Sequence, residues 1–341
     1  MRLLVVLTIA SAALAGAAYH WVEGQMAATG EVRPEPVMLT IAPGTSFRGA
    51  LSQLHEAGLL ADIELAYYWA RLREKSSIRS GTYRFSGGES AAEVLGILNV
   101  GRVVTERLTI AEGLNRWQIR DLLVAQGWMD GPTFDRLCDD ASLLEKYAIP
   151  AHSCEGFLFP ETYTLARGLA PAKIFSLLLQ TYRAYVDELL EAGQGPLNLN
   201  ELEFVTLASI VEKETGAAHE RPRIACVFYN RLKAKPAWRL ETDPTVIYAA
   251  ILEDPNFDGN IKRYHLRKME NPYNTYRNFG LPPGPIASPG KAALAAVQAP
   301  SACEDFFFVS KNNGEHIFCP TLSCHQKAVQ TWQIDYFRKK R

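Results

Sequence analysis

Hydrophobic and polar positions alternate along most of the chain at helix or strand spacing, but near the N-terminus the apolar residues run without interruption. Residues 3–22 carry no Asp, Glu, Lys or Arg. A helix of this length rises about 30 Å, the thickness of a bilayer's hydrocarbon core. Tyr19 and Trp21 lie where interfacial aromatic residues gather. The run predicts a transmembrane anchor over residues 1–22, with the rest of the chain exported. A cleaved signal peptide is the alternative, because small-x-small sites lie within the run.

The sequence after this run predicts a short linker followed by a small α/β module. Residues 23–36 are polar and contain two prolines, which is typical of a linker. In residues 37–105 the apolar spacing predicts a strand, two helices, an edge strand and a third helix. Thr45 or Ser46 can cap the first of these helices, Asp62 begins the second, and Ser90 and Glu93 form a capping box for the third. The module is too small for an enzyme cleft and is typical of a binding unit.

Residues 106–341 predict a larger mixed α+β domain, so the chain belongs to the α+β class. Its predicted elements are a strand at 107–110, helices at 115–126, 171–192, 200–215 and 220–234, a loop-rich segment at 254–290, strands at 306–310 and 316–318, and a last helix through Trp332. The segment 240–248 is interpreted as a turn around its proline.

A single carboxylate lies on the apolar face of the helix predicted at 200–215. Leu207, Ile210 and Val211 form the buried stripe of this helix, and Glu214 extends the stripe by one more turn, whereas Glu212 falls on the flank. Burial and the negative end of the helix dipole both raise the pKa of a carboxyl group. A partly protonated Glu214 would have the property that a general acid requires.

An ordinary structural role for Glu214 is the alternative, either at a frayed helix end or in an ion pair with Arg221 or Arg223. Four other segments, at 155–163, 240–248, 273–276 and 281–290, favour the binding of a sugar. Loops rich in Tyr, Asn, Thr and carboxylates suit sugar hydroxyls and amides. The candidate substrate-binding residues in these segments are Glu161, Tyr163, Glu241, Asp243, Thr245, Tyr248, Asn274, Thr275 and Tyr276.

Composition narrows the classes of protein. Lys and Arg number 36 against 37 Asp and Glu, and 48% of residues are hydrophobic, which excludes a disordered chain and argues against a nucleic-acid partner. We expect no cofactor and no metal, since the histidines near Cys319 and Cys324 are typical of strand ends.

An exported chain permits disulfides. Cys319 and Cys324 are close enough in sequence to bridge, whereas Cys226 is expected as a buried thiol.

Several long strings of residues resemble the endolytic murein transglycosylase (YceG-like) family. They are EGFLFPETY at 155–163, LASIVEKET at 207–215, NRL at 230–232, ETDPTVIY at 241–248, YNTY at 273–276, GLPPGPIASPG at 280–290 and FFFVSKNNGEHIF at 306–318. The resemblance covers about residues 37–335. One position departs from the family pattern: Glu241 stands where the family usually has Gln, which can donate as well as accept hydrogen bonds.

The resemblance implies a bitopic protein of the bacterial inner membrane with its bulk in the periplasm. It implies a LysM-like glycan-binding subdomain at 37–105 and a catalytic domain at 106–341. The implied reaction is non-hydrolytic cleavage between N-acetylmuramic acid and N-acetylglucosamine within nascent glycan strands, which leaves a 1,6-anhydro end and terminates elongation. The implied essential residue is Glu214, the second glutamate of EKE, as on the helix of a lysozyme-like enzyme. Peptidoglycan synthases are the implied partners.

Two other functions stay open on the sequence alone. A hydrolytic muramidase would need a second carboxylate beside Glu214, which Glu155, Glu161, Glu241 or Asp243 could supply. A non-catalytic scaffold would bind peptidoglycan for cell-wall synthesis and would not depend on Glu214.

Overall fold

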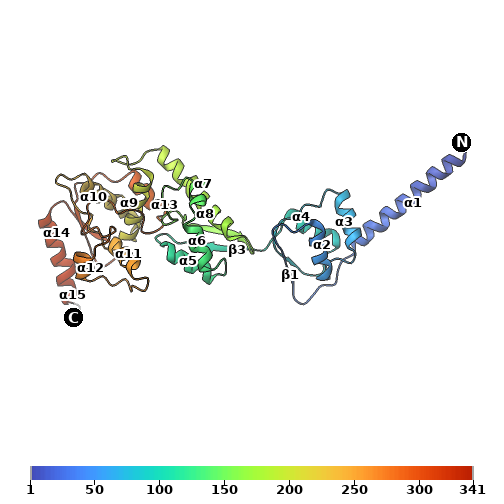
Figure 1. The fold of residues 1–341 in the computed structure, drawn as a ribbon, viewed down its shortest axis with the longest axis horizontal. Helices are drawn as coiled ribbons and strands as arrows, with labels where there is room; N and C mark the ends of the chain where they lie inside the picture. Colours follow the sequence, from blue (N-terminus) through green and yellow to red (C-terminus); the bar gives the residue numbers. More distant parts are fainter. Residues whose placement is uncertain (1, 340–341) are drawn as a thin grey trace. The chain divides into compact units, whose positions relative to one another are not determined.

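The computed structural model describes residues 2–339 and divides the chain into two compact units, whose elements are labelled in Figure 1. Unit 1 consists of the chain up to Leu108 together with Thr164–Ala170. Unit 2 consists of Thr109–Tyr163 together with the chain from Pro171 onward. Each unit has its own fold, and the sheets are all two-stranded among the residues described.

Unit 1 is built on one antiparallel strand pair with helices between and after its strands. β1 pairs with β2 so that Leu39 lies opposite Tyr83. The N-caps expected from the sequence are confirmed at Ser46, Asp62 and Ser90, where a side-chain oxygen accepts a backbone N–H of the first helical turn. The elements are α1 (Arg2–Ala27), β1 (Val37–Ile41), α2 (Phe47–Glu56), α3 (Ile63–Leu72), β2 (Gly81–Phe85) and α4 (Ala91–Val100).

The core of unit 1 lies between this strand pair and its helices. Tyr83 and Phe85 of β2, Leu51 and Leu54 of α2 and Leu95 of α4 are all fully buried in one cluster. Burying an aliphatic or aromatic side chain of this size stabilises a fold by about 1.5–3 kcal/mol. The apolar spacing that predicted these elements therefore also identifies the core.

The chain at 23–36, predicted as a linker, is instead packed onto unit 1. α1 continues to Ala27, and Met26 is only 2% exposed within the unit 1 core. Glu23 accepts a hydrogen bond from Trp69 Nε1 at 2.9 Å, and Arg33 donates to the carbonyl of Gly58 at 3.1 Å. The prolines and polar residues of this segment gave a linker-like composition, but side-chain contacts fix it to the module.

The predicted anchor coincides with α1, whose first residues are only partly described. Residue 1 and the side chains of residues 2–10 lie outside the described part of the structure. Within the described part, no helix combines the length and the apolar character that crossing a membrane would require.

β3 (Thr105–Thr109) and β4 (Thr162–Ala166) form the second strand pair, and the boundary between the units falls within both strands. Thr109 and Thr162 share a hydrogen bond between their hydroxyls at 3.0 Å, and Ile110 N donates to Glu161 O at 3.0 Å. The strand predicted at 107–110 is confirmed, two residues earlier than expected.

Unit 2 is mainly helical and surrounds α9. The side chains of residues 204–211 are buried, and α9 packs against α10, α11 and α13, the group labelled together in Figure 1. The helices are α5 (Arg116–Ala125), α6 (Gly131–Cys138), α7 (Ala141–Lys146), α8 (Pro171–Glu191), α9 (Glu201–Glu214), the 3₁₀ helix η1 (Ala218–Glu220), α10 (Arg221–Lys233), α11 (Asp243–Glu253), α12 (Arg263–Lys268) and α13 (Lys291–Gln298).

The C-terminal part of unit 2 is a strand hairpin followed by a helical tail. β5 pairs antiparallel with β6, with Val309 opposite Ile317. The elements are β5 (Phe307–Ser310), β6 (His316–Cys319), α14 (Leu322–Val329), the π-helix η2 (Gln330–Asp335) and α15 (Tyr336–Lys339). Both predicted strands and the last helix are confirmed.

Two predictions about unit 2 are wrong. The segment at 240–248 is not a turn, because α11 begins at Asp243 with Pro244 in its first turn, where a missing N–H costs no helical hydrogen bond. Cys226 is not a thiol but forms a disulfide with Cys303, 77 residues later. Apolar spacing placed Cys226 correctly inside a helix but carried no information about a partner so distant in sequence.

Candidate functional site

Glu214 is the last residue of α9, and the fold leaves its carboxyl at the end of a buried helix. The capping box of Asn200 and Glu203 fixes where α9 begins. The Glu214 side chain is partly exposed to solvent, but protein atoms surround most of its carboxyl group. This burial, reinforced by the nearby Asp243 carboxylate, raises the pKa of Glu214 to about 7. The predicted protonatable glutamate is therefore in place at the helix end.

The open side of Glu214 faces a cavity of about 410 Å³, assembled from segments far apart in the chain. Its wall combines three acidic groups, one arginine, a tyrosine and an apolar side supplied by the C-terminal hairpin and α14. The lining residues are Glu214, Arg231, Glu241, Asp243, Tyr276, Phe307, Phe308, Leu322 and His325.

A threonine network joins the two sequence motifs that border the cavity. Thr242 Oγ1 donates to Glu214 Oε1, which lowers the pKa of Glu214 against the effect of burial. Thr242 N donates to Thr275 Oγ1 at 3.1 Å, and the hydroxyls of Thr245 and Thr275 lie 2.8 Å apart. The TDPT and YNTY segments are thus fastened to each other directly behind the glutamate.

Arg231 and Glu241 add a guanidinium and a carboxyl group to the wall of the cavity. Arg231 is 7% exposed and donates from Nε to Phe306 O at 2.8 Å and from Nη1 to Leu240 O, so two loops close around its guanidinium. Burial lowers the pKa of Arg231, and its charge in turn lowers that of Glu214. Glu241 has a backbone φ of 48°. A non-glycine residue in this left-handed region is strained, and such residues gather at functional sites.

Asp243 and Tyr276 complete the polar side of the cavity. Tyr276 Oη donates to Asp243 Oδ1 at 2.7 Å. Burial raises the pKa of Tyr276, so the tyrosine stays protonated and Asp243 accepts its hydrogen bond. The cavity therefore holds carboxylates able to stabilise positive charge, next to a carboxyl able to donate a proton.

Glu212, the neighbour that helical spacing placed on the flank, has a structural role. Its side chain is 6% exposed, pairs with Arg221 at 2.8 Å and accepts from Gly290 N at 3.0 Å. The two glutamates of the EKE string thus differ: Glu212 ties α9 to α10 and to the start of α13, whereas Glu214 meets a cavity. An ion pair with Arg221 is one alternative role that the sequence allows for Glu214, but Arg221 pairs with Glu212 instead.

Glu155 is a second carboxyl with a raised pKa, and it lies elsewhere. It is 4% exposed, and burial raises its pKa to about 7. Its Oε2 accepts from Tyr248 Oη at 3.0 Å and from Arg116 N at 3.1 Å, while its Oε1 is buried without a partner among the described residues. It borders a separate hollow of about 330 Å³ that also includes Tyr273.

The structure brings only part of the predicted binding set to Glu214. Glu241, Asp243 and Tyr276 line its cavity, and Thr245 and Thr275 brace the cavity from behind. The other four predicted residues make contacts elsewhere. Glu161 pairs with Lys291, Tyr163 Oη donates to Phe159 O, Tyr248 holds Glu155, and the fully buried Asn274 donates to the carbonyls of His265 and Met269.

Sequence reasoning missed five residues of the cavity: Arg231, Phe307, Phe308, Leu322 and His325. Arg231 had a signal, because it is part of the NRL string. The three apolar residues had none, since a phenylalanine run is typical of a core strand. His325 was interpreted as a strand-end histidine, but it lies on α14 and faces the cavity.

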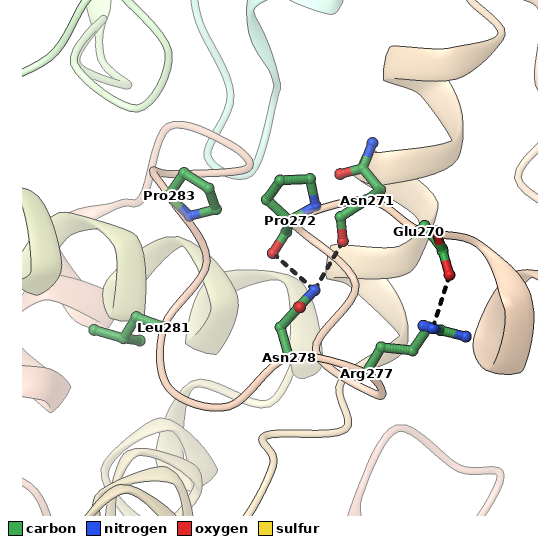
Figure 2. A pocket seen from close by; sticks show the side chains of 7 residues that line it. All are labelled: Glu270, Asn271, Pro272, Arg277, Asn278, Leu281 and Pro283. Atoms are coloured by element: carbon green, nitrogen blue, oxygen red, sulfur yellow. Dashed lines mark hydrogen bonds and ion pairs between the residues drawn. The ribbon is translucent and has the colours of Figure 1, made fainter.

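A third hollow, of about 530 Å³, lies along the loop that follows α12 (Figure 2). Its polar side chains bind one another: Arg277 donates to Glu270 Oε1 at 3.1 Å, and Asn278 Nδ2 donates to the carbonyls of Asn271 and Pro272. These hydrogen bonds hold the loop that carries Tyr276 in its conformation. Because the polar groups of the hollow already bind groups of the same loop, the candidate functional site is the Glu214 cavity.

Comparisons with known proteins identify the family of this chain. A model of the YceG-like family matches residues 39–331. An endolytic murein transglycosylase of Bacillus subtilis (strain 168) is 29% identical over 316 residues, which are 87% of this chain and 84% of that protein. One from Streptococcus pneumoniae serotype 2 is 26% identical over 318 residues, which are 80% of this chain and 54% of that protein.

A solved structure shares the fold. The crystal structure of a yceG-like protein from Listeria monocytogenes aligns with a TM-score of 0.56 at 27% identity, covering 86% of this chain and 99% of that one. Since the family model also spans most of the sequence, from the first strand of unit 1 to the helical tail of unit 2, the chain belongs to the YceG-like family.

Proposed function

We propose that this chain is an endolytic lytic transglycosylase that cuts peptidoglycan between N-acetylmuramic acid and N-acetylglucosamine inside glycan strands. One observation carries the proposal: Glu214, with a pKa raised to about 7, opens into a cavity whose wall holds further acidic groups and an apolar side. The names of the relatives from Bacillus subtilis and Streptococcus pneumoniae support the same reaction.

The first step uses Glu214 as a general acid. Its carboxyl proton passes to the glycosidic oxygen, the bond from that oxygen to muramyl C1 breaks, and N-acetylglucosamine leaves with a free hydroxyl. The muramyl ring becomes oxocarbenium-like. The carboxylates of Glu241 and Asp243 line the cavity and stabilise its positive charge, each by a modest amount because both side chains are exposed to solvent.

The second step uses the same residue as a base. The Glu214 carboxylate takes the proton of the muramyl C6 hydroxyl, whose oxygen forms a bond to C1 and closes the 1,6-anhydro ring. Glu214 returns to its protonated state, so no water is consumed and one acid–base residue suffices. Thr242 and Arg231 support the ionised state between the two steps, since both lower the pKa of Glu214.

A hydrolytic muramidase is the second candidate, and one observation favours it. Glu241 and Asp243 line the same cavity as Glu214, so either carboxylate could activate a water, as the second carboxylate of a glycosidase does. Of the other two residues considered for this role, Glu161 pairs with Lys291 and Glu155 borders a different hollow.

The test is a digestion of purified glycan strands with the full chain in detergent, comparing wild type with Glu214→Gln. Internal fragments that end in 1,6-anhydro-muramic acid, lost in the variant, would support the transglycosylase. Fragments heavier by one water would support the muramidase. Glycan retained but uncut by a folded wild type would support a non-catalytic scaffold and overturn the proposed function.

The cellular setting is part of the same proposal. The uncharged run at 3–22 supports an inner-membrane anchor, with both units in the periplasm. The order β1–α2–α3–β2 of unit 1 supports a LysM-like, glycan-binding role. An anchored enzyme would cut strands as they emerge, so peptidoglycan synthases are the proposed partners and termination of elongation the proposed outcome.

A further inference from the structure

His325 is a titratable residue in the wall of the Glu214 cavity to which the mechanism above gives no role. His325 lies on α14 and borders the cavity together with Glu214 and Glu241. Its ring stacks on Phe307 of β5, with 4.8 Å between the ring centroids and an interplanar angle of 22°. The C-terminal hairpin and α14 thus present an imidazole, as well as apolar surface, to whatever occupies the cavity.

The two ring nitrogens of His325 have different surroundings. Nδ1 is buried and has no hydrogen-bond partner among the described residues. Among the described residues, only Nδ1 of the two ring nitrogens is both buried and without a partner. The ring is partly exposed, so its accessible nitrogen is Nε2.

These surroundings select a neutral ring with its proton on Nε2. An imidazolium would need an acceptor for Nδ1–H, and no described residue supplies one to the buried Nδ1. Burial and the charge of Arg231 lower the pKa of His325, against a smaller opposing effect of Glu241. A buried acceptor without a partner is also more readily tolerated than a buried N–H without one. His325 therefore offers an N–H donor from Nε2.

The fold fixes this donor in place. The disulfide between Cys319 and Cys324 joins the end of β6 to the first turn of α14, one residue before His325. Thr321 caps the helix by accepting Cys324 N. A ring held by a disulfide-braced helix and by stacking on Phe307 loses little conformational freedom when it binds a ligand, which favours binding.

We infer that His325 is a substrate-contacting residue, whose Nε2–H donates to an acetamido carbonyl or hydroxyl oxygen of the amino sugar seated beside Glu214. The inference rests on the proposed function for the identity of the sugar. It predicts that one face of the glycan meets the C-terminal hairpin and α14, not only the loops around Thr242 and Thr275. His325 orients the strand, and Glu214 performs the proton transfers.

The test separates binding from chemistry by working in the Glu214→Gln background, where strands are held but not cut. Calorimetry with purified glycan oligomers compares this parent with added His325→Ala, His325→Gln and Gln326→Ala. Gln326 is the exposed neighbour of His325 on the same helix and serves as the matched control. Loss of the donor by His325→Ala should weaken binding about tenfold, in line with leaving a polar group of the ligand unsatisfied. His325→Gln, which keeps an N–H donor, should recover most of the affinity, and Gln326→Ala should change nothing.

Two results would overturn the inference. One is equal affinity of the parent and His325→Ala; the other is equal loss in the Ala and Gln variants together with a lowered melting temperature, which indicates a structural role. The proposed function fails separately, when wild type makes no anhydro product. A wild type that cuts glycan while His325→Ala binds normally would remove the His325 contact and leave the enzyme assignment standing.

Discussion

Glu214 and Glu155 are two buried carboxyls of one domain with the same raised pKa of about 7, yet their surroundings differ. Glu214 opens into a cavity that it shares with other charged and aromatic groups. Glu155 also borders a hollow, but it is only 4% exposed, with one oxygen held by Tyr248 and Arg116 N and the other without a partner among the described residues. Burial is the largest cause of the raised pKa in both, so a raised pKa marks a desolvated carboxyl. Both glutamates border a hollow, so the exposure of the carboxyl and the charged groups around it distinguish the chemical residue from the structural one.

The largest expected effect is on the rate of glycan cleavage when each of the two glutamates is replaced by glutamine. Glu214→Gln should lower the rate of glycan cleavage by about 10²–10⁴, the usual contribution of general acid–base catalysis. Glu155→Gln should leave the rate within about threefold, because Gln keeps the acceptor for Tyr248 and Arg116 N. The measurement is initial rates of fragment release with both variants. A loss at Glu155 as large as that at Glu214 would refute the distinction.

The second effect is a pH-dependent stability specific to Glu155. Its carboxyl keeps its proton in the folded chain up to about pH 7 but loses it near 4.5 when unfolded. The folded state therefore binds more protons between these values, and its stability falls as pH rises through this window. Above pH 7 the accumulated loss is about 3 kcal/mol, at about 1.4 kcal/mol per pKa unit.

Urea denaturation of wild type and Glu155→Gln at several pH values measures this loss, because the variant lacks the titration. The difference in unfolding free energy between the two proteins should move by about 3 kcal/mol in favour of the variant from pH 4.5 to pH 8. The same subtraction with Glu214→Gln should give a smaller change, since the Glu214 carboxyl is partly exposed. Parallel curves for wild type and Glu155→Gln would mean that Glu155 is not desolvated.

A smaller effect follows from removing one hydroxyl beside each carboxyl. Thr242→Val deletes the donor that lowers the pKa of Glu214, so the decline of activity at alkaline pH should move to higher pH. Tyr248→Phe deletes the corresponding donor to Glu155, costs about 1 kcal/mol of stability and leaves the pH–rate profile in place. Profiles of kcat/KM against pH measure the effect of Thr242→Val, and thermal melts measure the loss of stability in Tyr248→Phe. A profile shifted by Tyr248→Phe would link Glu155 to the reaction.

The smallest effect concerns Glu241, an exposed carboxylate on the rim of the Glu214 cavity. Glu241→Gln restores the residue usual in the family and should change the rate by about threefold or less, because exposed charges interact weakly through solvent. The two residues differ mainly in charge, so strain at this backbone position is unchanged. A loss comparable to that of Glu214→Gln would instead identify Glu241 as a second catalytic carboxylate and favour the muramidase.

The sequence predicted those features that depend on neighbouring positions. Helical spacing placed Glu214 in line with the buried stripe of α9, and its carboxyl lies at the end of that buried helix. The buried surface is wider than predicted, because every side chain from 204 to 211 is buried and the side chain of Glu212 is only 6% exposed. The caps at Ser46, Asp62 and Ser90 follow from local hydrogen bonding within one turn. Apolar period and capping chemistry act over a few residues, so they can be recognised in the sequence.

Features that depend on distant segments could not be predicted in the same way. The cavity joins Glu214 to His325, more than a hundred residues later, and no local pattern reports that approach. The Cys226–Cys303 disulfide escaped prediction for the same reason. The threonines of the TDPT and YNTY segments were expected to touch substrate, but their hydroxyls bind each other and stay inside the fold. Residue type suggested sugar binding, and only the three-dimensional arrangement showed that most of that polarity is used internally.

The strand pair β3–β4 has a consequence for anyone who wishes to exchange the parts of this protein. The chain leaves unit 1 after Leu108, returns to it for Thr164–Ala170 and leaves again at Pro171. The small module is therefore interleaved with the large domain along the sequence. A chimera that grafts a different binding module onto unit 2 needs three junctions, because a single cut after Leu108 would leave Thr164–Ala170 of unit 1 on unit 2 and would separate β4 from most of its partner strand β3.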